Sequence, residues 1–401
     1  MKKIYLQRAK SQIARPTTIR DINRQIVLNY VRERAPISRA EIARETNLQR
    51  SSVSSIVDSL QIVGLIEEIG SGKSSGGRKP TLLKLKTGMP AALGIDITPR
   101  KTTIALGDLE GNILDKEVLP ISPDLKFMSE QILYGISKII GRNPLIDSEM
   151  EVGISIPGIA DQKTGESIYI PYFHWSNWNI SNQITEKFGF PVTIDNDANA
   201  IALAELWFGR EKTRKYSNFI TLLVGEGIGT GIIFDGQIYR GSKGAAGEFG
   251  HMSIGSDGLV KCSCGGFDCW EAHASEKATI ARYHKLLDTH LPVMTGMTMQ
   301  QLIGLANFGE ENAITALKEA ALFLGLGLSN LIVGLSPQAI IVSGSITKAW
   351  KLISSEIHTA AHRGIRSDLP KTVIIPSSLG DDPTLTGALS LILARKFSLA
   401  D

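Results

Sequence analysis

The sequence has only three cysteines among its 401 residues and no long apolar run. No stretch approaches the roughly 18 consecutive apolar residues that span a bilayer, and the beginning, MKKIYLQRAKSQIARP, lacks the apolar core of a signal peptide. We therefore expect a cytoplasmic protein with no membrane partner. In a reducing compartment an odd number of cysteines argues against a disulfide framework, so we interpret the three thiols as metal ligands or reactive groups.

Net charge is also small, at +3, but it is unevenly distributed. Residues 1–90 hold 17 Lys and Arg against 7 Asp and Glu, a net charge of +10, whereas residues 91–401 carry a net charge of −7. This polarity predicts a small basic module for a polyanion, joined to a larger and mildly acidic body. With 43% hydrophobic residues, the chain is long enough for two or three domains.

The basic segment has the pattern of a winged helix-turn-helix. Apolar residues recur at helical spacing in TTIRDINRQIVLNYVRER, and Pro36 ends this first helix. A second helix, SRAEIARETN, opens with the capping box of Ser38 and Glu41 and ends at Asn47. The apolar residues that we expect the third helix, QRSSVSSIVDSLQIVGLI, to bury are Val53, Ile56, Val57, Leu60 and Val63.

Short polar side chains on the other face of the third helix suit the major groove of DNA. The segment LIEEIGSGKSSGGRKPTLLKL has two β-prone halves around a Gly/Ser-rich tip, which predicts a wing that enters a minor groove or holds phosphates. The residues that we expect to contact DNA are Gln49, Arg50, Ser51, Ser52, Ser54, Ser55, Lys73, Arg78 and Lys79. We assign residues 1–86 to this DNA-binding domain.

After KTGMP, buried strands alternate with helices, as in AALGIDI, MEVGISIPG and AIIVSGSI, which predicts α/β layers with ligands at the carboxyl ends of strands. Asn196 and Asp197 stand at such a strand end, directly before a helix. The carboxylate of Asp197 could accept a proton from a hydroxyl group or cap the helix. The glycine-rich segment GEGIGTG, residues 225–231, could hold phosphates or form a tight hairpin.

All three cysteines lie in the stretch HMSIGSDGLVKCSCGGFDCWEAH. Cys262, Cys264 and Cys269 have the spacing C-x-C-x4-C, and two glycines between them let the backbone turn tightly. Either His251 or His273 could complete a tetrahedral zinc site. Because four protein ligands leave no open position for water, we expect Zn²⁺ to be structural here.

Several of these segments resemble the characteristic blocks of the ROK family: GAAGEFGHM with CSCGGFDCWEAHAS, DNDANAIALAE, ISIPGIAD and PSSLGDDPTLTGALSL. With SSGGRKP in the wing, nearly the whole chain is similar to ROK transcriptional repressors of the xylose-responsive kind. The resemblance implies a winged helix-turn-helix followed by a two-lobed, actin-like or hexokinase-like α/β domain. The first lobe would comprise residues 91–200, to which a C-terminal helix, 384–401, returns, and the second lobe residues 201–383.

The resemblance also implies which residues of the larger domain bind the metal and the sugar. The fourth metal ligand becomes His251, which places His273 behind the ligands or in solvent. The sugar-binding positions that carry over are Asn196, Asp197, Glu248, His251 and Glu271. Trp175 and Trp178 could form a stacking wall for the sugar ring or pack in the core. Zinc would then shape the sugar site without taking part in chemistry.

The family includes ATP-dependent sugar kinases, so particular residues have to show whether this chain is a kinase or a sugar sensor without catalytic activity. Asp197 stands at the position of the catalytic base. On the phosphate side, however, DITPRK has Thr98 and Pro99 in place of glycines, and Glu226 brings a carboxylate close to where a triphosphate would lie. We therefore expect no catalytic residue, with Asp197 a vestigial base.

The function that follows is a sugar-responsive repressor of carbohydrate-utilisation genes. A homodimer or tetramer would bind operator DNA, and a sugar inducer bound between the lobes would weaken that binding. One alternative is an active sugar kinase that also binds DNA. Another is a module whose sugar pocket is vestigial and whose ligand is a second protein. The residues name neither the sugar nor the operator sequence.

Overall fold

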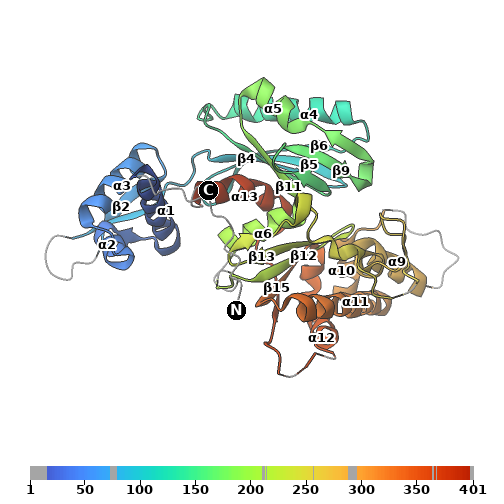
Figure 1. The fold of residues 1–401 in the computed structure, drawn as a ribbon. Helices are drawn as coiled ribbons and strands as arrows, with labels where there is room; N and C mark the ends of the chain where they lie inside the picture. Colours follow the sequence, from blue (N-terminus) through green and yellow to red (C-terminus); the bar gives the residue numbers. More distant parts are fainter. Residues whose placement is uncertain are drawn as a thin grey trace, which may run out of the picture. The chain divides into compact units, whose positions relative to one another are not determined.

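The computed structural model describes residues 16–72, 79–209, 213, 215–255, 257–287, 296–363, 365–366 and 368–397. They separate into two compact units (Figure 1). The smaller unit comprises residues 1–91, 108–112 and 393–401, and the larger unit comprises residues 92–107 and 113–392. Each unit is described by itself below.

The smaller unit is a winged helix-turn-helix with a three-stranded sheet of order β1-β3-β2. Its elements are α1 (Pro16–Arg34), β1 (Ile37–Ser38), α2 (Arg39–Thr46), α3 (Arg50–Ile62), β2 (Ile66–Ser71) and β3 (Thr81–Leu85). The capping box expected at the start of α2 is confirmed, since the Ser38 amide donates to Glu41 Oε2 at 2.9 Å and the Glu41 amide donates to Ser38 Oγ at 3.3 Å. The helix ends at Asn47, which adopts the left-handed φ of 58°.

The core face of α3 is nearly the one that its sequence predicts. Val53, Ile56, Val57 and Leu60 are buried, as expected. The expectation for Val63 is wrong, because this side chain is 55% exposed. Val63 follows the last residue of α3 and precedes a glycine in the left-handed region, so the helical spacing that would bury it no longer applies.

The end of α13 (Pro383–Phe397) supplies part of the core of the smaller unit. Phe397 is fully buried, and its carbonyl oxygen accepts a hydrogen bond from Asn29 Nδ2 of α1 at 2.8 Å. The guanidinium of Arg32, also on α1, lies 4.9 Å from the centre of the Phe397 ring, a cation–π distance. The end of α13 therefore stabilises a unit made mostly of residues from the first ninety of the chain.

The larger unit contains two five-stranded sheets with the same connectivity. In each sheet, three consecutive strands form an antiparallel meander and two later strands add in parallel beside the first of the three. The orders are β6-β5-β4-β7-β11 and β14-β13-β12-β15-β16. This repetition is the duplicated α/β fold that the resemblance implies. We call the parts built on the two sheets the first lobe and the second lobe.

The first lobe packs helices against a sheet whose central strands are buried along their whole length. Its elements are β4 (Ala92–Ile97), β5 (Lys101–Gly107), β6 (Ile113–Pro120), α4 (Leu125–Arg142), β7 (Val152–Ile156), β8 (Ile159–Asp161), β9 (Glu166–Ile170), η1 (Pro171–Phe173), β10 (Trp175–Trp178), α5 (Ile180–Phe188) and β11 (Val192–Asn196). Of the two roles considered for Trp175 and Trp178, the structure shows core packing. Their side chains are 3% and 2% exposed, and their ring centres lie 5.0 Å apart.

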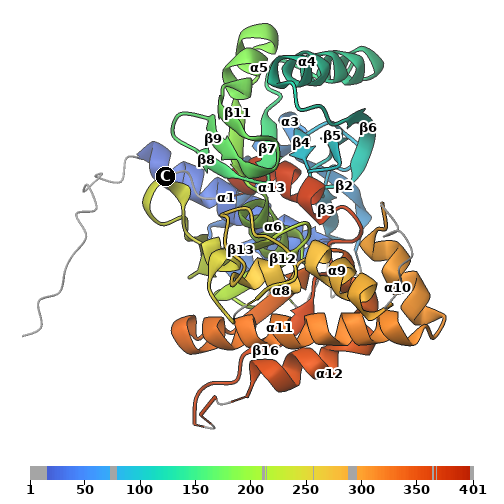
Figure 2. The same ribbon diagram turned by 90° about the vertical axis from the view of Figure 1, so that its right-hand side faces the viewer.

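The second lobe carries most of the helices, and α11 and α12 run side by side in both views (Figures 1 and 2). Its elements are α6 (Asp197–Phe208), β12 (Phe219–Val224), β13 (Ile228–Phe234), β14 (Gln237–Ile238), η2 (Ser242–Gly244), η3 (Glu248–His251), α8 (Trp270–Ala274), α9 (Glu276–Leu286), α10 (Met299–Asn307), α11 (Glu311–Leu335), β15 (Ala339–Ser343), η4 (Ser345–Ala349), α12 (Trp350–Ala361) and β16 (Val373–Pro376).

Among the described helices, α11 has the length and composition that could cross a membrane, with a mean hydropathy of 1.5 in its most apolar window. The helix contains no run of 18 consecutive apolar residues, because Lys318 and Glu319 in its first half and Ser329 and Asn330 in its second half interrupt it. Its apolar residues have a different explanation, because one face of the helix is buried in the core of the second lobe. Buried core helices of globular proteins can be as long and as apolar as a membrane-spanning helix.

The first part of α13 belongs to the larger unit and lies on the sheet of the first lobe (Figure 1). Gly94 of β4 permits this close packing, since a Cβ atom there would lie 2.9 Å from Leu389 Cγ. Gly153 of β7 does the same opposite the backbone of Ala388. A single helix therefore contributes to the cores of both units.

We expect Phe397→Ala to lower the free energy of unfolding of the smaller unit by about 3 to 5 kcal/mol, because it removes a fully buried aromatic ring. Urea-dependent hydrogen exchange of α1 in the full chain measures this. Phe308→Ala is the matched control, since that ring is 94% exposed. Equal exchange of α1 in the two variants would contradict the packing described for α13.

Candidate functional site

Of the residues expected to contact DNA, those that the structure describes lie on α3 or directly before it, except Lys79, which lies two residues before β3. Those with exposed side chains are Gln49, Arg50, Ser51, Ser55 and Lys79, and those that are half-buried are Ser52 and Ser54. Lys73 and Arg78 lie outside the described residues. The exposed set gives α3 a polar, positively charged amino end, which is the chemistry that suits base edges and phosphates.

Arg39, the first residue of α2, fixes α3 relative to the rest of the smaller unit. Its guanidinium contacts Asp58 of α3 at 2.7 Å and Glu68 of β2 at 3.2 Å. The same group donates to Gln61 Oε1 at 3.0 Å. This arginine therefore neutralises two carboxylates on a module that is otherwise basic.

The four metal-ligand candidates come together in the second lobe. The ligand atoms of His251, Cys262, Cys264 and Cys269 all lie within 4.8 Å of one another. His251 Nδ1 is 3.1 Å from Cys262 Sγ, and the sulfurs of Cys264 and Cys269 are 3.4 Å apart. This group could hold a metal ion, and three sulfurs with one imidazole nitrogen are a soft, four-member donor set that suits Zn²⁺.

His273, the other histidine considered as a ligand, does not belong to this cluster. Its side chain is 4% exposed, and its ring stacks on Phe323 with ring centres 4.8 Å apart. Burial lowers the pKa of His273, and the nearby charge of Arg282 lowers it further. The expectation that His273 could face solvent is therefore wrong, because the helix that follows Cys269 turns the side chain into the core.

The first two sugar-site candidates stand at the junction between β11 and α6. Asn196 caps α6, since its Oδ1 accepts hydrogen bonds from the amides of Ala198 at 2.9 Å and Asn199 at 3.4 Å. Its Nδ2 donates to the carbonyl oxygen of Gly158 at 3.1 Å. The capping role considered for Asp197 is therefore carried mainly by its neighbour.

Asp197 accepts one hydrogen bond, from the amide of Ala198 at 2.8 Å, and is half-buried. Burial raises its pKa to about 7, and the negative charges of Asp96 and Glu248 contribute to this increase. A carboxyl group that titrates near neutrality can act as donor or acceptor toward a hydroxyl group.

The other three candidates are physically joined to the metal cluster. Glu271, which is 8% exposed, accepts hydrogen bonds at Oε1 from Cys262 Sγ at 3.2 Å and from the amide of Ser263 at 3.1 Å. The Nε2 atom of His251 lies 3.5 Å from Glu248 Oε2, on the side of the ring away from Cys262. One imidazole therefore has a nitrogen toward the thiols and a nitrogen toward a carboxylate.

Tyr172 of η1 is a polar residue near these carboxylates that the sequence reasoning missed. A Cβ atom at Gly227 would lie 2.7 Å from its hydroxyl oxygen, so the absence of a side chain at that position makes room for the phenol. Burial raises the pKa of Tyr172 well above its usual range, and the charges of Glu271 and Asp197 raise it further. The hydroxyl therefore stays protonated and can donate. No motif signals it, because it comes from a different lobe than Glu271.

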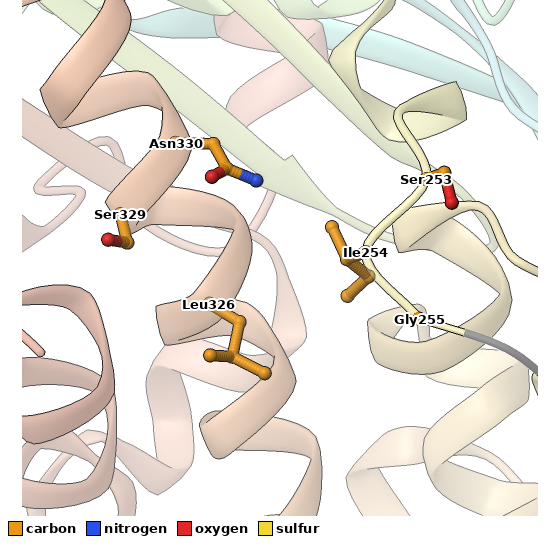
Figure 3. A pocket seen from close by; sticks show the side chains of 6 residues that line it. All are labelled: Ser253, Ile254, Gly255, Leu326, Ser329 and Asn330. Carbon is orange, nitrogen blue, oxygen red and sulfur yellow. The ribbon is translucent and has the colours of Figure 1, made fainter. Parts of the chain in front are cut away.

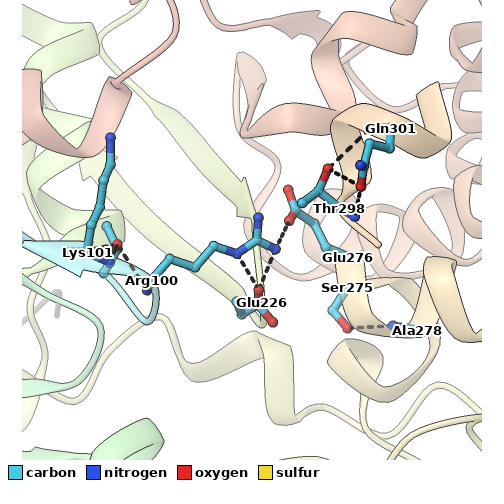
Figure 4. Close-up of polar contacts among 9 residues, drawn as sticks. Arg100, Lys101, Glu226, Ser275, Glu276, Ala278, Thr298 and Gln301 are labelled. Carbon is cyan, nitrogen blue, oxygen red and sulfur yellow. Dashed lines mark hydrogen bonds and ion pairs between the residues drawn. The ribbon is translucent and has the colours of Figure 1, made fainter. Parts of the chain in front are cut away.

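The glycine-rich segment 225–231 forms a tight hairpin between β12 and β13, one of the two structures considered for it. The Gly225 amide donates to the carbonyl oxygen of Gly227 at 3.0 Å, and Val224 pairs with Ile228. The side chain of Glu226, at the tip, contacts Arg100 of the first lobe at 2.6 Å (Figure 4). Glu226 is therefore paired with a cation that the sequence reasoning left out.

A separate cavity of about 490 Å³ lies between α11 and the segment that follows His251. Figure 3 shows the six residues that line it, which are Ser253, Ile254, Gly255, Leu326, Ser329 and Asn330. None of the five sugar-site candidates belongs to this lining. The cavity therefore does not bear on their chemistry.

We expect Cys264→Ser to remove bound metal from the purified full chain, because it takes one of four ligands from the cluster. Elemental analysis should give about one metal ion per wild-type chain and much less for the variant. Asp257→Asn is the control, since this exposed carboxylate lies in the same loop but outside the cluster. Equal metal content in wild type and Cys264→Ser would contradict the assignment.

Asp96 gives a pH dependence. It is 3% exposed, accepts a hydrogen bond from Thr384 Oγ1 at 2.7 Å, and burial raises its pKa to about 7 from an ordinary value of 3.8. Because the folded state binds this proton more tightly, the stability it contributes is complete below about pH 4 and is lost as the pH rises through 7.

Between pH 4 and 7 the free energy of unfolding of the wild type should therefore fall by at most about 1.4 kcal/mol per pH unit because of Asp96. Asp96→Asn cannot ionise, so this contribution should be absent from the variant. Urea unfolding of the larger unit at pH 5 and pH 8 measures the difference. Asp381→Asn, at a side chain that is 82% exposed, is the control. Parallel pH profiles for wild type and Asp96→Asn would show that the carboxyl group titrates at its ordinary pH.

Comparison with known proteins agrees with this architecture. The ROK family model matches residues 92–395, and the MarR family model matches residues 26–74. The xylose repressor of Bacillus spizizenii is 34% identical over 384 residues, which cover 95% of this chain and 97% of that repressor.

Solved structures show the same fold. The crystal structure of a ROK family transcriptional regulator, a homologue of the E. coli MLC protein, has a TM-score of 0.78 at 24% identity and covers 95% of this chain and 97% of its own. A ROK family glucokinase from Streptomyces griseus, in complex with glucose and AMPPNP, has a TM-score of 0.67 at 27% identity and covers 75% of this chain and 98% of its own. The chain belongs to the ROK family and, with its MarR-type helix-turn-helix unit, to the transcriptional repressors of that family.

Proposed function

We propose that this protein represses carbohydrate-utilisation genes and that a sugar bound between the lobes of its larger unit releases it from operator DNA. A homodimer or tetramer would present two copies of α3 to a palindromic operator. The similarity to a xylose repressor supports a monosaccharide as the effector. The five candidate polar residues do not distinguish xylose from other sugars of similar size.

The observation that carries the proposal is that three of the five candidate sugar residues, Glu248, His251 and Glu271, form one connected structure with the metal cluster. Glu271 Oε1 contacts the loop of the thiols, and His251 turns one nitrogen to Cys262 and the other toward Glu248. A rigid array of carboxylates and one imidazole suits a ligand whose hydroxyl groups donate and accept hydrogen bonds at fixed angles.

We infer that the metal is a structural Zn²⁺ ion held by His251, Cys262, Cys264 and Cys269. When bound, it would fix the loop and the tautomer of the histidine, with no open position for catalysis. With Nδ1 of His251 occupied, Nε2 carries the proton and can donate to a sugar hydroxyl, while Glu248 and Glu271 accept. The sugar hydroxyl groups would thus be recognised by one hydrogen-bond donor, His251, and two acceptors, Glu248 and Glu271.

The route from sugar to DNA in this proposal is α13. Near its start, Thr384 donates to Asp96 at the carboxyl end of β4, close enough to Asp197 for their charges to interact. At its end, Phe397 packs against α1 of the smaller unit. A ligand that changes the closure of the lobes would shift this helix, and it can weaken operator binding only by its difference in affinity for the two states.

The rival function is an ATP-dependent sugar kinase. Asp197, with its pKa raised to about 7, is suited to accept a proton from a hydroxyl group. The phosphate side supports a sensor instead, because Pro99 offers no amide in the β4–β5 turn and Arg100 and Glu226 contact each other there. We therefore propose that the protein does not transfer phosphate.

The test is operator binding by fluorescence anisotropy with a panel of sugars. We expect one sugar to weaken operator binding. Glu248→Gln should raise the sugar concentration needed for half of this effect roughly tenfold to hundredfold, because the substitution removes a charged hydrogen-bond acceptor. Glu248 is half exposed, so the variant should still fold and bind operator. Glu149→Gln, at an exposed position of the first lobe, is the matched control.

The same titrations include ATP and magnesium. If the wild-type protein transfers phosphate from ATP to the sugar and Asp197→Asn abolishes this transfer, the protein is a kinase and the proposal is contradicted. Operator binding that no sugar changes would favour a protein ligand in place of the sugar.

A further inference from the structure

Arg100 ties the two lobes together through a single side chain. It lies in the turn between β4 and β5 of the first lobe, and its guanidinium reaches two carboxylates of the second lobe (Figure 4). Its Nη2 and Nε atoms lie 2.6 and 2.9 Å from Glu226 Oε1, and Nη2 lies 3.4 Å from Glu276 Oε2. The arginine therefore bridges the β12–β13 turn and the start of α9.

The two carboxylates are held in place by the second lobe itself. The Glu276 amide donates to the carbonyl oxygen of Gly225 at 2.9 Å, so the start of α9 and the β12–β13 turn move together. The Glu276 side chain is 7% exposed and stands in the first turn of α9, where the helix dipole favours a negative charge. The side chain of Arg100 is half exposed, so its two carboxylate partners are the more buried members of this arrangement.

A second ion pair between the lobes behaves differently. Arg240 contacts Asp195 Oδ2 at 3.0 Å, but Asp195 lies on β11, and the chain passes from β11 directly into α6 of the second lobe. Because the lobes are covalently joined there, opening them changes this distance little. Arg100 instead joins two turns that are not continuous in the chain, so opening would separate its partners.

We propose that Arg100 is a positioning residue that holds the lobes in the arrangement to which the sugar binds. This inference rests on the function proposed above. Ile228, which follows the β12–β13 turn, donates its amide to Glu271 Oε2 at 3.3 Å, and Gly229 lies beside Asp197. Gly227 in this turn leaves room for the hydroxyl group of Tyr172 from the first lobe. The turn that Arg100 holds thus lies beside Glu271 and Asp197 of the second lobe and Tyr172 of the first lobe, and the affinity for sugar follows the fraction of molecules in which these groups are close.

Isothermal titration of the full chain with D-xylose, or with whichever sugar of the panel weakens operator binding, tests the proposal. We expect Arg100→Gln to raise the sugar Kd about twofold to fivefold, as for a partly exposed ion pair. Arg100→Gln combined with Glu226→Gln should raise it little further, because the contact is already absent. Arg142→Gln is the matched control, since Arg142 pairs with Asp115 and Glu117 within the first lobe at a similar exposure.

Salt separates this role from a general loss of stability. Added sodium chloride should weaken sugar binding by wild type and by Arg142→Gln, whereas the Kd of Arg100→Gln should change less, because the screened ion pair is gone. Arg100→Lys should restore only part of the affinity, since one ammonium group does not match the fork that reaches both carboxylates.

An Arg100→Gln variant with the wild-type Kd and salt dependence would overturn the role of Arg100 and leave the proposed function intact. A wild-type protein that binds no sugar would instead overturn the proposed function. In that case hydrogen exchange of the β12–β13 turn decides the role of Arg100. Faster exchange in Arg100→Gln than in Arg142→Gln would support it, and equal exchange would overturn it.

Discussion

The buried carboxylate of Glu271 is the interaction on which the candidate site depends. One of its oxygens accepts from the loop that carries the thiols, and the other accepts from the first residue of β13. A carboxylate that is 8% exposed requires such partners, because burying it without them would cost several kcal/mol. Its hydrogen bonds fix the metal loop relative to the sheet, and with it the orientation of His251.

Repetition of one sheet topology explains why the candidate groups can meet. In each lobe the first and fourth strands of the repeat run parallel, so their carboxyl ends lie at the same edge. Asp96 is the second-last residue of β4, and Asn196 ends β11, the strand that runs parallel to the fourth, with Asp197 directly after it. The second lobe brings Glu271 and the β12–β13 turn to these groups, and Gly227 in the turn leaves room for the hydroxyl group of Tyr172.

Sequence reasoning succeeded where the decisive contacts are local. The capping box of Ser38 and Glu41 and the spacing of the three cysteines are properties of a few consecutive residues, and the structure shows both the box and the cluster. It failed at Val63 and at the alternative of a solvent-facing His273, where the end of a helix and the direction of the following one decide burial. Helical spacing alone does not contain that information.

Arg100 and Tyr172 could not have been found in this way, because their partners lie more than fifty residues away in the other lobe. The pairing of Arg100 with Glu226 also changes the argument against a kinase. A carboxylate with its own cation repels phosphate less than an unpaired one. The argument against a kinase now rests on Pro99, which offers no amide, and on Arg100, which is paired with Glu226 where a phosphate would lie.

The central claim is that sugar and operator are coupled through two states of one protein, and coupling of this kind is reciprocal. The most direct measurement is the Kd for the effector sugar in the absence of DNA and again with the protein saturated by operator. Our account predicts that sugar binds the operator complex more weakly, by the same factor by which sugar weakens operator binding. Equal sugar affinity in the two conditions would contradict it.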